Sequence, residues 1–492
     1  MSTREESADD VFATQRYETL RARHLAASRS AIGAAFQRLG WSGQALSDER
    51  CERLRALIAH ARQHSPWHAR RLADVDPLQV SEQTLNMLPT MSKDDLMSNF
   101  DEIVTDRALS LTLVNAHLQA LSRGNSYLLD QYRAVATSGT SGQRGVFVYD
   151  WDGWLEAYAV VQRYALAYAS AAGMTPAQTH GFVIAHVAAA LPTHMTHALT
   201  ETFKTPQFHF HQFPVTLPLE KIVAGLDEAK PAVLQGYPSM LRLLAHEAHA
   251  RRLDIMPRLV ISAGEPLDAQ TREVLQGAFP GASIQNWWGT SETSGLAMSC
   301  GAGPWMHLSD DTLIVELVDA AGNPIEPGQT AARIYVTNLF NKVTPLIRYE
   351  LSDQPTLMEG TCPCGSAHRR VADLQGRHEE LFVYRPDAGR SIVVHPKVFT
   401  SVLFGEPGVL DYQITQTRRG AHVAFLQGAP VNCEAVARAL REAFSALGLR
   451  DAAITVEPCD TLVRAQGGKL SRYLSLSRHG THEDDAPDCP IP

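Results

Sequence analysis

The stretch Thr137-Ser-Gly-Thr-Ser-Gly-Gln-Arg-Gly145 places four hydroxyls, three glycines and one cation between two apolar segments. Hydroxyls and the backbone amides that glycine leaves accessible can surround phosphate oxygens, and a guanidinium can neutralise their charge. The stretch does not end in Gly-Lys-Ser/Thr, which excludes a Walker loop. It therefore indicates a phosphate-binding loop of another kind, with a flexible surface turn as the alternative.

Around this loop, apolar strand-like runs alternate with helical stretches from about residue 131 to 350. We expect strands at 182–187, 232–235, 259–262 and 283–287. We expect helices at 154–172, 239–252 and 268–279. This alternation predicts an α/β fold with mixed or parallel sheets and crossover helices.

The secondary structure that the sequence predicts changes on both sides of this region. Residues 1–100 are expected to be helical, because Leu54, Leu57, Ile58 and Ala61 recur at helical spacing and Ser92 with Asp95 forms a capping box. Residues 300–370 are expected to be rich in β-hairpins. The chain should therefore form a large N-terminal domain over 1–378, a small α+β domain over 379–479 and a disordered tail over 480–492.

Composition excludes several classes of protein. The 492 residues carry 44 Lys and Arg against 53 Asp and Glu, a net charge of −9, so no overall basic field exists for nucleic acid or an anionic membrane. Seven cysteines, odd in number and partly clustered, favour a reducing compartment. The charged N-terminus and the lack of an apolar run of about 18 residues favour a cytoplasmic protein.

Five further motifs follow in order along the chain. They are Ser262-Ala-Gly-Glu265-Pro266, Asn286-Trp-Trp-Gly-Thr-Ser-Glu292, Leu346-Ile-Arg-Tyr-Glu-Leu-Ser-Asp353, Gly376-Arg377-His378-Glu379-Glu380 and Gly467-Gly468-Lys469. With the loop, and with Leu88-Pro-Thr-Met-Ser-Lys-Asp-Asp-Leu96, this series resembles the adenylate-forming superfamily, and most closely its phenylacetate-CoA ligase branch. The resemblance covers nearly the whole chain. It implies an AMP-forming ligase that first joins a carboxylic acid to the α-phosphate of ATP.

The resemblance also implies roles for residues of these motifs in binding the nucleotide. The phosphates would be held by Thr137, Ser138, Gly139, Thr140, Ser141 and Gly142, with Arg144 where the family more often has lysine. The adenine slot would be formed by Glu265, Pro266, Asn286, Trp287 and Trp288, with a core role as the alternative for the two tryptophans. Other residues of the same motifs are also expected to bind the nucleotide: Gly264, Gly289, Thr290 and Ser291. Glu292 would bind Mg²⁺ and Asp353 would accept both ribose hydroxyls, with a helix cap and an exposed turn as the alternatives.

Lys469 matches the lysine that a mobile C-terminal domain brings to the α-phosphate during adenylation. Arg377 and Glu379 match the hinge of that domain, and Arg377 is also expected at the nucleotide. A solvated loop lysine is the alternative for Lys469, because lone charges on loops are usually exposed.

Cys300, His307, Cys362 and Cys364 make a plausible tetrahedral set for Zn²⁺. Four protein ligands leave no open position, so the ion would be structural rather than catalytic. Free buried thiols are the alternative. Cys51, Cys433, Cys459 and Cys489 show no ligand pattern.

The acyl group is expected near Tyr237, Ser239, Ala263 and His186, with ordinary packing as the alternative for the histidine. The branch implies an aryl acid as substrate and CoA as acceptor. Residues 381–396 differ from the sequence that the branch usually has at this position, which leaves the acceptor open. The alternatives to CoA are an amine and a carrier thiol. A further alternative is that the enzyme activates nitrite to diazotise an aryl amine. A non-catalytic nucleotide-binding homologue is the remaining alternative, against which Glu292, Asp353 and Lys469 argue. No nucleic-acid or membrane partner is expected, and the oligomeric state, a homodimer included, stays open.

Overall fold

The computed structural model describes residues 8–137, 144–188, 191–215, 217–375, 382–384, 392–394, 396–403, 406, 408–464 and 470–476. The chain divides into two compact units, with the first division between Leu374 and Gln375. Within the described ranges, no helix has both the length and the apolarity that crossing a membrane requires.

The N-terminal part of the larger unit is helical, as the sequence predicts. Its helices are α1 (Ala8–Arg38), α2 (Gly43–His64), α3 (Pro66–Arg71), η1 (Pro77–Gln79), η2 (Leu85–Met87), α4 (Lys93–Ser98), α5 (Phe100–Ile103) and α6 (Leu111–Ala120). The apolar side of α2, including Leu54 and Ile58, is buried against Ile314 and Leu339. The expected capping box is confirmed, because Ser92 and Asp95 bond reciprocally at the start of α4.

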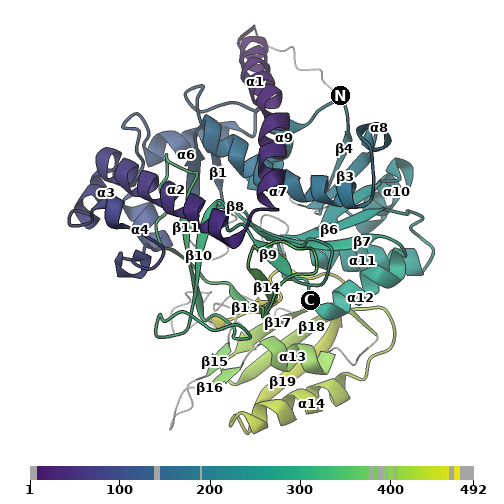
Figure 1. Cartoon of the computed structure of the whole chain (residues 1–492). Helices are drawn as coiled ribbons and strands as arrows, with labels where there is room; N and C mark the ends of the chain where they lie inside the picture. Colours follow the sequence, from purple (N-terminus) through teal and green to yellow (C-terminus); the bar gives the residue numbers. More distant parts are fainter. Residues whose placement is uncertain are drawn as a thin grey trace. The chain divides into compact units, whose positions relative to one another are not determined.

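A large mixed sheet forms the centre of the larger unit (Figure 1). Among the described residues it has nine strands in the order β13-β14-β9-β8-β7-β6-β5-β3-β4. The strands are β3 (Val183–Ala188), β4 (His209–Pro214), β5 (Val233–Gly236), β6 (Leu259–Ala263), β7 (Ser283–Thr290), β8 (Ser294–Met298), β9 (Met306–Leu308), β13 (Gln354–Leu357) and β14 (Arg370–Gln375). Strands β4, β3, β5, β6 and β7 are parallel, so their carboxyl ends lie at one edge. The predicted α/β fold class is confirmed.

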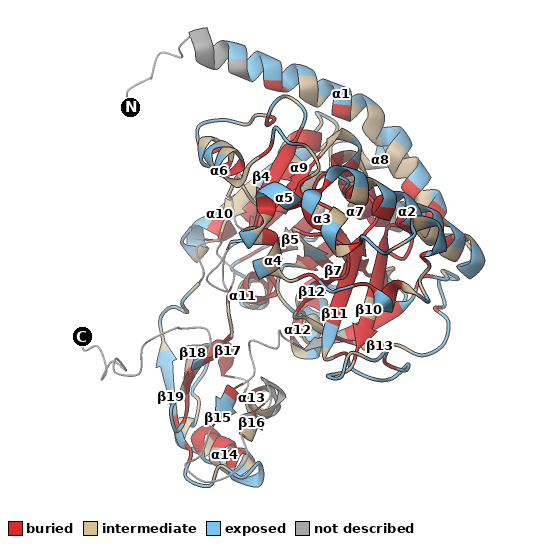
Figure 2. Ribbon diagram, turned by 90° about the vertical axis from the view of Figure 1, so that its left-hand side faces the viewer, coloured by how far each residue is buried: buried red, intermediate tan, exposed pale blue. Residues whose placement is uncertain are grey.

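Helices cover both faces of the parallel strands. One face packs Leu234, Val260 and Ile284 against the helices α10 (Leu219–Ala229), α11 (Pro238–His249) and α12 (Ala269–Ala278). The opposite face packs Ile261 and Trp287 against Tyr164 of α7 (Trp151–Ala171), and α1 packs on α7 and on α9 (Met195–Phe203). Burial on both faces explains why β6 is an apolar run rather than an alternating strand. Figure 2 shows buried residues in red in the interior of the larger unit, whereas the outer side of α1 is exposed.

Two smaller sheets complete the described part of the larger unit. The strands β1 (Arg133–Ala136) and β2 (Val146–Tyr149) form an antiparallel hairpin around the predicted phosphate loop. An antiparallel sheet has the order β10 (Leu313–Val318), β11 (Arg333–Asn338) and β12 (Tyr349–Leu351). The hairpin-like segments expected after residue 300 are thus present.

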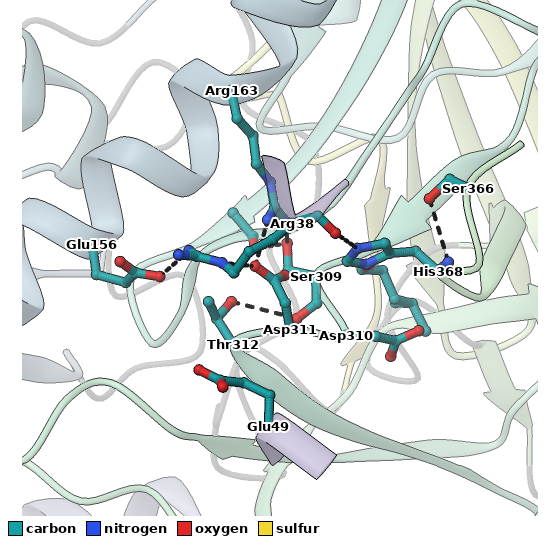
Figure 3. Close-up of polar contacts among 12 residues, drawn as sticks. Arg38, Glu49, Glu156, Arg163, Ser309, Asp310, Asp311, Thr312, Ser366 and His368 are labelled. Atoms are coloured by element: carbon teal, nitrogen blue, oxygen red, sulfur yellow. Dashed lines mark hydrogen bonds and ion pairs between the residues drawn. The ribbon is translucent and has the colours of Figure 1, made fainter. Parts of the chain in front are cut away.

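A buried ion network fixes the end of α1 (Figure 3). Arg38 Nε and Arg163 Nη1 each donate to Asp311 Oδ2 at 2.6 Å, and Arg38 also pairs with Glu156. The side chains of Arg163 and Asp311 are fully buried. His368 places its Nε2 3.2 Å from the carbonyl oxygen of Arg38. These contacts join α1, α7 and the segment before β10.

The smaller unit is built around its own sheet. In its described part, the order is β19 (Ala453–Cys459), β18 (Gly420–Gln427), β17 (Val409–Thr417) and β20 (Tyr473–Leu474). The helices α13 (Pro396–Leu403) and α14 (Cys433–Ala446) bury Phe399 and Phe444 in its core, with a hairpin of β15 (Phe382–Tyr384) and β16 (Ile392–Val394).

The elements α9, β4 and α10, which occupy residues between 195 and 229, lack a clear signal in the sequence. Strand β4 carries His209, His211 and Gln212 among its aromatic residues and ends at Pro214, a composition that lacks the usual run of β-branched residues. It is the edge strand of the sheet, where polar side chains are tolerated.

Candidate active site

The base of the predicted phosphate loop is closed by backbone contacts. Thr137 N donates to Gly145 O, and Gly145 N donates to Thr137 Oγ1, both at 2.9 Å. Arg144 donates from Nε to Thr137 O at 3.2 Å and from Nη2 to Thr193 Oγ1 at 2.6 Å. Ala136 N also donates to Thr193 O. Because Thr193 follows β3, these contacts tie the loop base to the carboxyl edge of the parallel strands.

Lys93, to which sequence analysis gave no role, also reaches the loop base. Its Cε lies 3.3 Å from the position that a Cβ would take on Gly145. Lys93 is the first residue of α4, where the helix dipole disfavours a positive charge. A lysine at that position of a capped helix is the signal that could have drawn attention to it.

The turn between β7 and β8 holds Glu292 in a buried position. Its side chain is 8% exposed, and its carbonyl oxygen accepts from Asn338 Nδ2 at 2.8 Å. Tyr149 Oη, from β2, donates to Ser291 O at 2.7 Å. Burial, together with the carboxylate of Glu292, raises the pKa of both Tyr149 and Tyr349. A carboxylate is a hard oxygen ligand of the kind that divalent cations such as Mg²⁺ prefer.

Strand β2 therefore lies between two of the predicted motifs. At its beginning it adjoins the loop base, and at its end Tyr149 contacts the turn of Glu292. In the same turn, Gly289 is required by packing, because a Cβ there would lie 2.7 Å from Ser294 O. Thr290 and Thr293 place their hydroxyl oxygens 3.0 Å apart.

Residues predicted for the adenine slot gather at the carboxyl edge of the sheet. Asn286 pairs with Ser262, and Trp287 with Ala263, across β6 and β7. Gly264 follows β6 with a φ of 84°, a backbone conformation that favours glycine. Glu265 Oε2 accepts from Ser239 N at 3.1 Å, at the start of α11, while Pro266 is exposed. A carboxylate suits that position because the first amides of a helix lack partners.

Both tryptophans of the motif are buried, in separate clusters on opposite faces of β7. Trp287 is 6% exposed and packs with Tyr164 and Ile261, and its Nε1 donates to Gln285 Oε1 at 3.0 Å. Trp288 is 7% exposed and lies in the main core of the larger unit. This burial shows that both side chains pack in the interior, and their contribution to an adenine slot remains a prediction.

Asp353 lies between β12 and β13 and is half-buried. Arg348, in the same motif, forms two bonds with Glu316, at 2.9 and 3.0 Å, and donates to Leu88 O at 2.5 Å. The adjoining backbone of Met91 pairs with Tyr349. These contacts bring the segment of Lys93 beside the motif of Asp353.

Eight residues to which the motifs assign a role at the site lie outside the described residues, and their predicted roles stay predictions. Five belong to the phosphate loop and three to the hinge and the C-terminal motif: Ser138, Gly139, Thr140, Ser141, Gly142, Arg377, Glu379 and Lys469.

The four predicted zinc ligands converge. One ligand atom from each of Cys300, His307, Cys362 and Cys364 lies within 4.8 Å of the others. Tetrahedral Zn²⁺ at its usual bond lengths separates two sulfurs by roughly 3.8 Å and a sulfur from a nitrogen by roughly 3.5 Å. The observed separations are 3.7 Å for Cys300 Sγ to Cys362 Sγ and 3.4 Å for Cys364 Sγ to His307 Nε2. The set is compatible with a structural zinc ion.

The surroundings set the protonation of His307 and Cys300 in this cluster. Burial lowers the pKa of His307 to about 4, so its imidazole is neutral at pH 7. Its Nδ1 lies 3.0 Å from the carbonyl oxygen of His368, which assigns the proton to Nδ1 and leaves Nε2 free to coordinate. Burial raises the pKa of Cys300 to about 12, so a thiolate there at neutral pH requires a bound cation. Trp305 Nε1 donates to Cys362 Sγ at 3.2 Å.

The residues predicted to surround the acyl group lie on β3, on β6 and at the beginning of α11. Tyr237 and Ser239 are buried at the beginning of α11, Ala263 ends β6, and His186 is in β3. His186 and Ala263 lie on different strands of the same parallel set, with β5 between them. All four are at or near the carboxyl edge, where ligands bind in open α/β sheets.

Comparisons with known proteins agree with this architecture. The family described as AMP-binding enzyme matches residues 162–338. A protein of Thermus thermophilus named phenylacetate-coenzyme A ligase is 25% identical over 463 residues, 87% of this chain and 96% of the relative. A protein of Pseudomonas putida with the same name is 25% identical over 174 residues, 34% of this chain and 38% of the relative.

A solved structure shares the fold. The crystal structure of 2-hydroxyisobutyryl-CoA ligase in the postadenylation state superposes with a TM-score of 0.67 at 18% identity, covering 89% of this chain and 91% of that one. The family match, the relative that spans nearly the full length and the shared fold together place this chain among the enzymes of the AMP-binding, adenylate-forming superfamily.

Proposed function

We propose that this protein activates an aromatic carboxylic acid with ATP as an acyl adenylate and then transfers the acyl group to CoA. The observation that carries the proposal is the convergence of the loop base, the turn of Glu292 and the carboxyl edge of the parallel strands around β2. The similarity to a phenylacetate-coenzyme A ligase over 87% of the chain supports an aryl acid and CoA as the substrates.

The first half-reaction brings two anions together, a carboxylate and the α-phosphate of ATP. The protein must therefore supply positive charge at the phosphates and hold the reactants in line. Arg144 and Lys93 supply that charge at the loop base. Because Arg144 is already bonded to Thr137 O and Thr193 Oγ1, its guanidinium is held in a fixed orientation.

Glu292 would hold Mg²⁺, which when bound neutralises phosphate charge. The fit rests on its buried carboxylate and on a backbone fixed by Asn338 and Tyr149. Asp353 would orient the ribose through its two oxygens. Lys469, on a segment outside the described residues, would donate to the α-phosphate during adenylation.

The cluster of Cys300, His307, Cys362 and Cys364 would hold Zn²⁺ in a structural role. It joins the segment before β9 to the loop before β14. All four donors come from the protein, so the ion would stabilise this corner of the sheet and take no part in the reaction.

Exchange of labelled pyrophosphate into ATP, dependent on an added aryl acid, tests the adenylation step. We expect exchange in the unaltered protein and a loss of at least about 100-fold in Glu292→Gln, because a Mg²⁺ ligand is removed. Glu350→Gln, which alters an exposed carboxylate on β12, is the matched control. Absence of exchange with every acid of a panel of aryl and amino-aryl acids would refute the proposal.

The acceptor is tested separately, by formation of a thioester after CoA is added to the adenylating enzyme. We expect a thioester to accumulate with CoA and no amide to form with an added amine. Adenylation without CoA-dependent product would refute the second half-reaction and favour an amine, a carrier thiol or nitrite activation instead.

A further inference from the structure

Three neighbouring strands place polar side chains side by side on one face of the large sheet. His186 of β3 lies in register with Gln212 of β4 and with Gln235 of β5. Paired residues on adjacent strands point to the same face. These three side chains therefore form one row, which we call the polar row.

Two contacts identify the face on which the polar row lies. Gln235 pairs with Ile261, which packs with Trp287 against Tyr164 of α7. Gln212 Nε2 lies 3.2 Å from Nδ1 of His197 on α9. The row thus lies on the face covered by α7 and α9, within two residues of the ends of β3, β4 and β5.

The polar row continues directly into buried apolar residues. Along the same register, Gln235 is followed by Ile261 of β6 and then by Gln285 of β7, whose amide oxygen already accepts from Trp287. One face near the carboxyl edge therefore offers an apolar part, with Ile261 and Trp287, and a polar part, with His186 and Gln235.

The polar part retains unused capacity for hydrogen bonds. His186 is 9% exposed and its ring packs edge to face with Phe210. Among the described residues, neither its ring nitrogens nor the side-chain amide of Gln235 form a hydrogen bond within the protein. Such groups are costly to bury unless a ligand or water satisfies them. The half-buried Gln235 lies on an inner strand, so this part of the face is not fully covered by helices.

The polar row is also neutral. Burial, with a smaller contribution from His197, lowers the pKa of His186 to about 4, so at pH 7 it offers one donor and one acceptor. Gln212 and Gln235 carry no charge. A charged substituent would be left without a counter-ion in this row, whereas a hydroxyl or an amino group would be satisfied.

We propose that the polar row binds a neutral hydrogen-bonding substituent, a hydroxyl or an amino group, on the ring of the aromatic acid, while the ring packs on the side of Ile261 and Trp287. This specificity rests on the proposed function, because it assumes that an aryl acid is activated at this edge of the sheet. His186 and Gln235 would be the residues that select the substrate.

The test compares matched acids in the pyrophosphate exchange assay with the full chain. Hydroxybenzoic, aminobenzoic and methylbenzoic acids substituted at the 2, 3 and 4 positions are used with benzoic acid. We expect a hydroxy or amino acid to exceed the methyl acid of the same position in kcat/KM by at least about tenfold, because the methyl group leaves the row unpaired. Equal or better use of the methyl acids or of benzoic acid would overturn the inference and leave the proposed function standing. No exchange with any acid would refute both.

Variants assign the discrimination to the polar row. His186→Phe keeps a ring of similar shape, and Gln235→Leu keeps a similar volume, but both remove hydrogen bonds. Each should reduce the preference for the hydroxy or amino acid to about threefold or less, with the KM for ATP unchanged. His211→Phe, on the opposite face of β4, is the control and should keep the full preference. If His186→Phe does not fold, Gln235→Leu alone tests the inference. Folded variants that keep the wild-type preference for the hydroxy or amino acid would overturn the inference.

Discussion

Replacing Asp311 by asparagine removes the carboxylate that receives two buried guanidinium groups. Arg38 Nε and Arg163 Nη1 both donate to Asp311 Oδ2 at 2.6 Å, and Arg163 and Asp311 are inaccessible to solvent (Figure 3). Arg38 retains its pair with Glu156, but Arg163 has no second carboxylate among its described ion pairs. Asp311→Asn therefore leaves one positive charge buried without compensation.

The expected cost follows from that burial. Breaking a buried ion pair by neutralising one partner destabilises a protein by about 3–5 kcal/mol. The unfolding entropy of about 2.1 cal/mol/K per residue gives roughly 0.8 kcal/mol/K for the larger unit, so its Tm should fall by about 4 to 6 °C. An exposed pair such as Arg70 with Glu102 contributes about 0 to 1 kcal/mol, so Glu102→Gln should lower the Tm by about 1 °C at most.

The pH dependence gives a second check. Burial alone would raise the pKa of Asp311, but Arg163 and Arg38 outweigh it and hold that pKa well below its usual range. A depressed folded-state pKa gives stability that is present above the unfolded pKa of about 3.9 and is lost as the pH falls through the folded value. The difference in Tm between the two proteins should therefore be full at pH 7 and shrink below about pH 4.

Differential scanning calorimetry of the unaltered protein, Asp311→Asn and Glu102→Gln at pH 7, 5 and 3.5 measures both effects. A Tm within about 1 °C of the unaltered protein for Asp311→Asn at pH 7 would refute the role assigned to this network. A difference that grows in acid would refute the pKa argument.

Three further outcomes are expected. The purified protein should contain about one equivalent of zinc by mass spectrometry of metals, Cys364→Ser should lose most of it, and Cys433→Ser should retain it, because Cys433 lies outside the cluster. Lys93→Ala should lower kcat/KM for ATP by about 10- to 100-fold, because a cation at the loop base is lost, and Lys93→Arg should largely restore it. Unchanged kinetics in Lys93→Ala would remove Lys93 from the site. Lys469→Ala should depress pyrophosphate exchange by at least about 100-fold while ATP binding, measured by calorimetry, stays largely intact, and full exchange would exclude Lys469 from the reaction.

Local sequence determined the features that depend on near neighbours. The spacing of Leu54, Leu57, Ile58 and Ala61 predicts the buried side of α2, and Ser92 with Asp95 predicts the start of α4, because helical periodicity and capping act within a few residues. The choice of Cys300, His307, Cys362 and Cys364 also came from the sequence, since few residue types bind zinc.

Only the tertiary structure decided which distant residues meet. Lys93 reaches Gly145 because Met91 pairs with Tyr349 and Arg348 bonds to Leu88, and none of these contacts has a local signature. His186, Gln212 and Gln235 form one row because of strand register, which a shift of a single residue would destroy. Register is set by the packing of whole strands and helices over long sequence separations. The sequence by itself therefore determined the types of chemistry this chain carries, and the packed sheet decided which side chains share a surface.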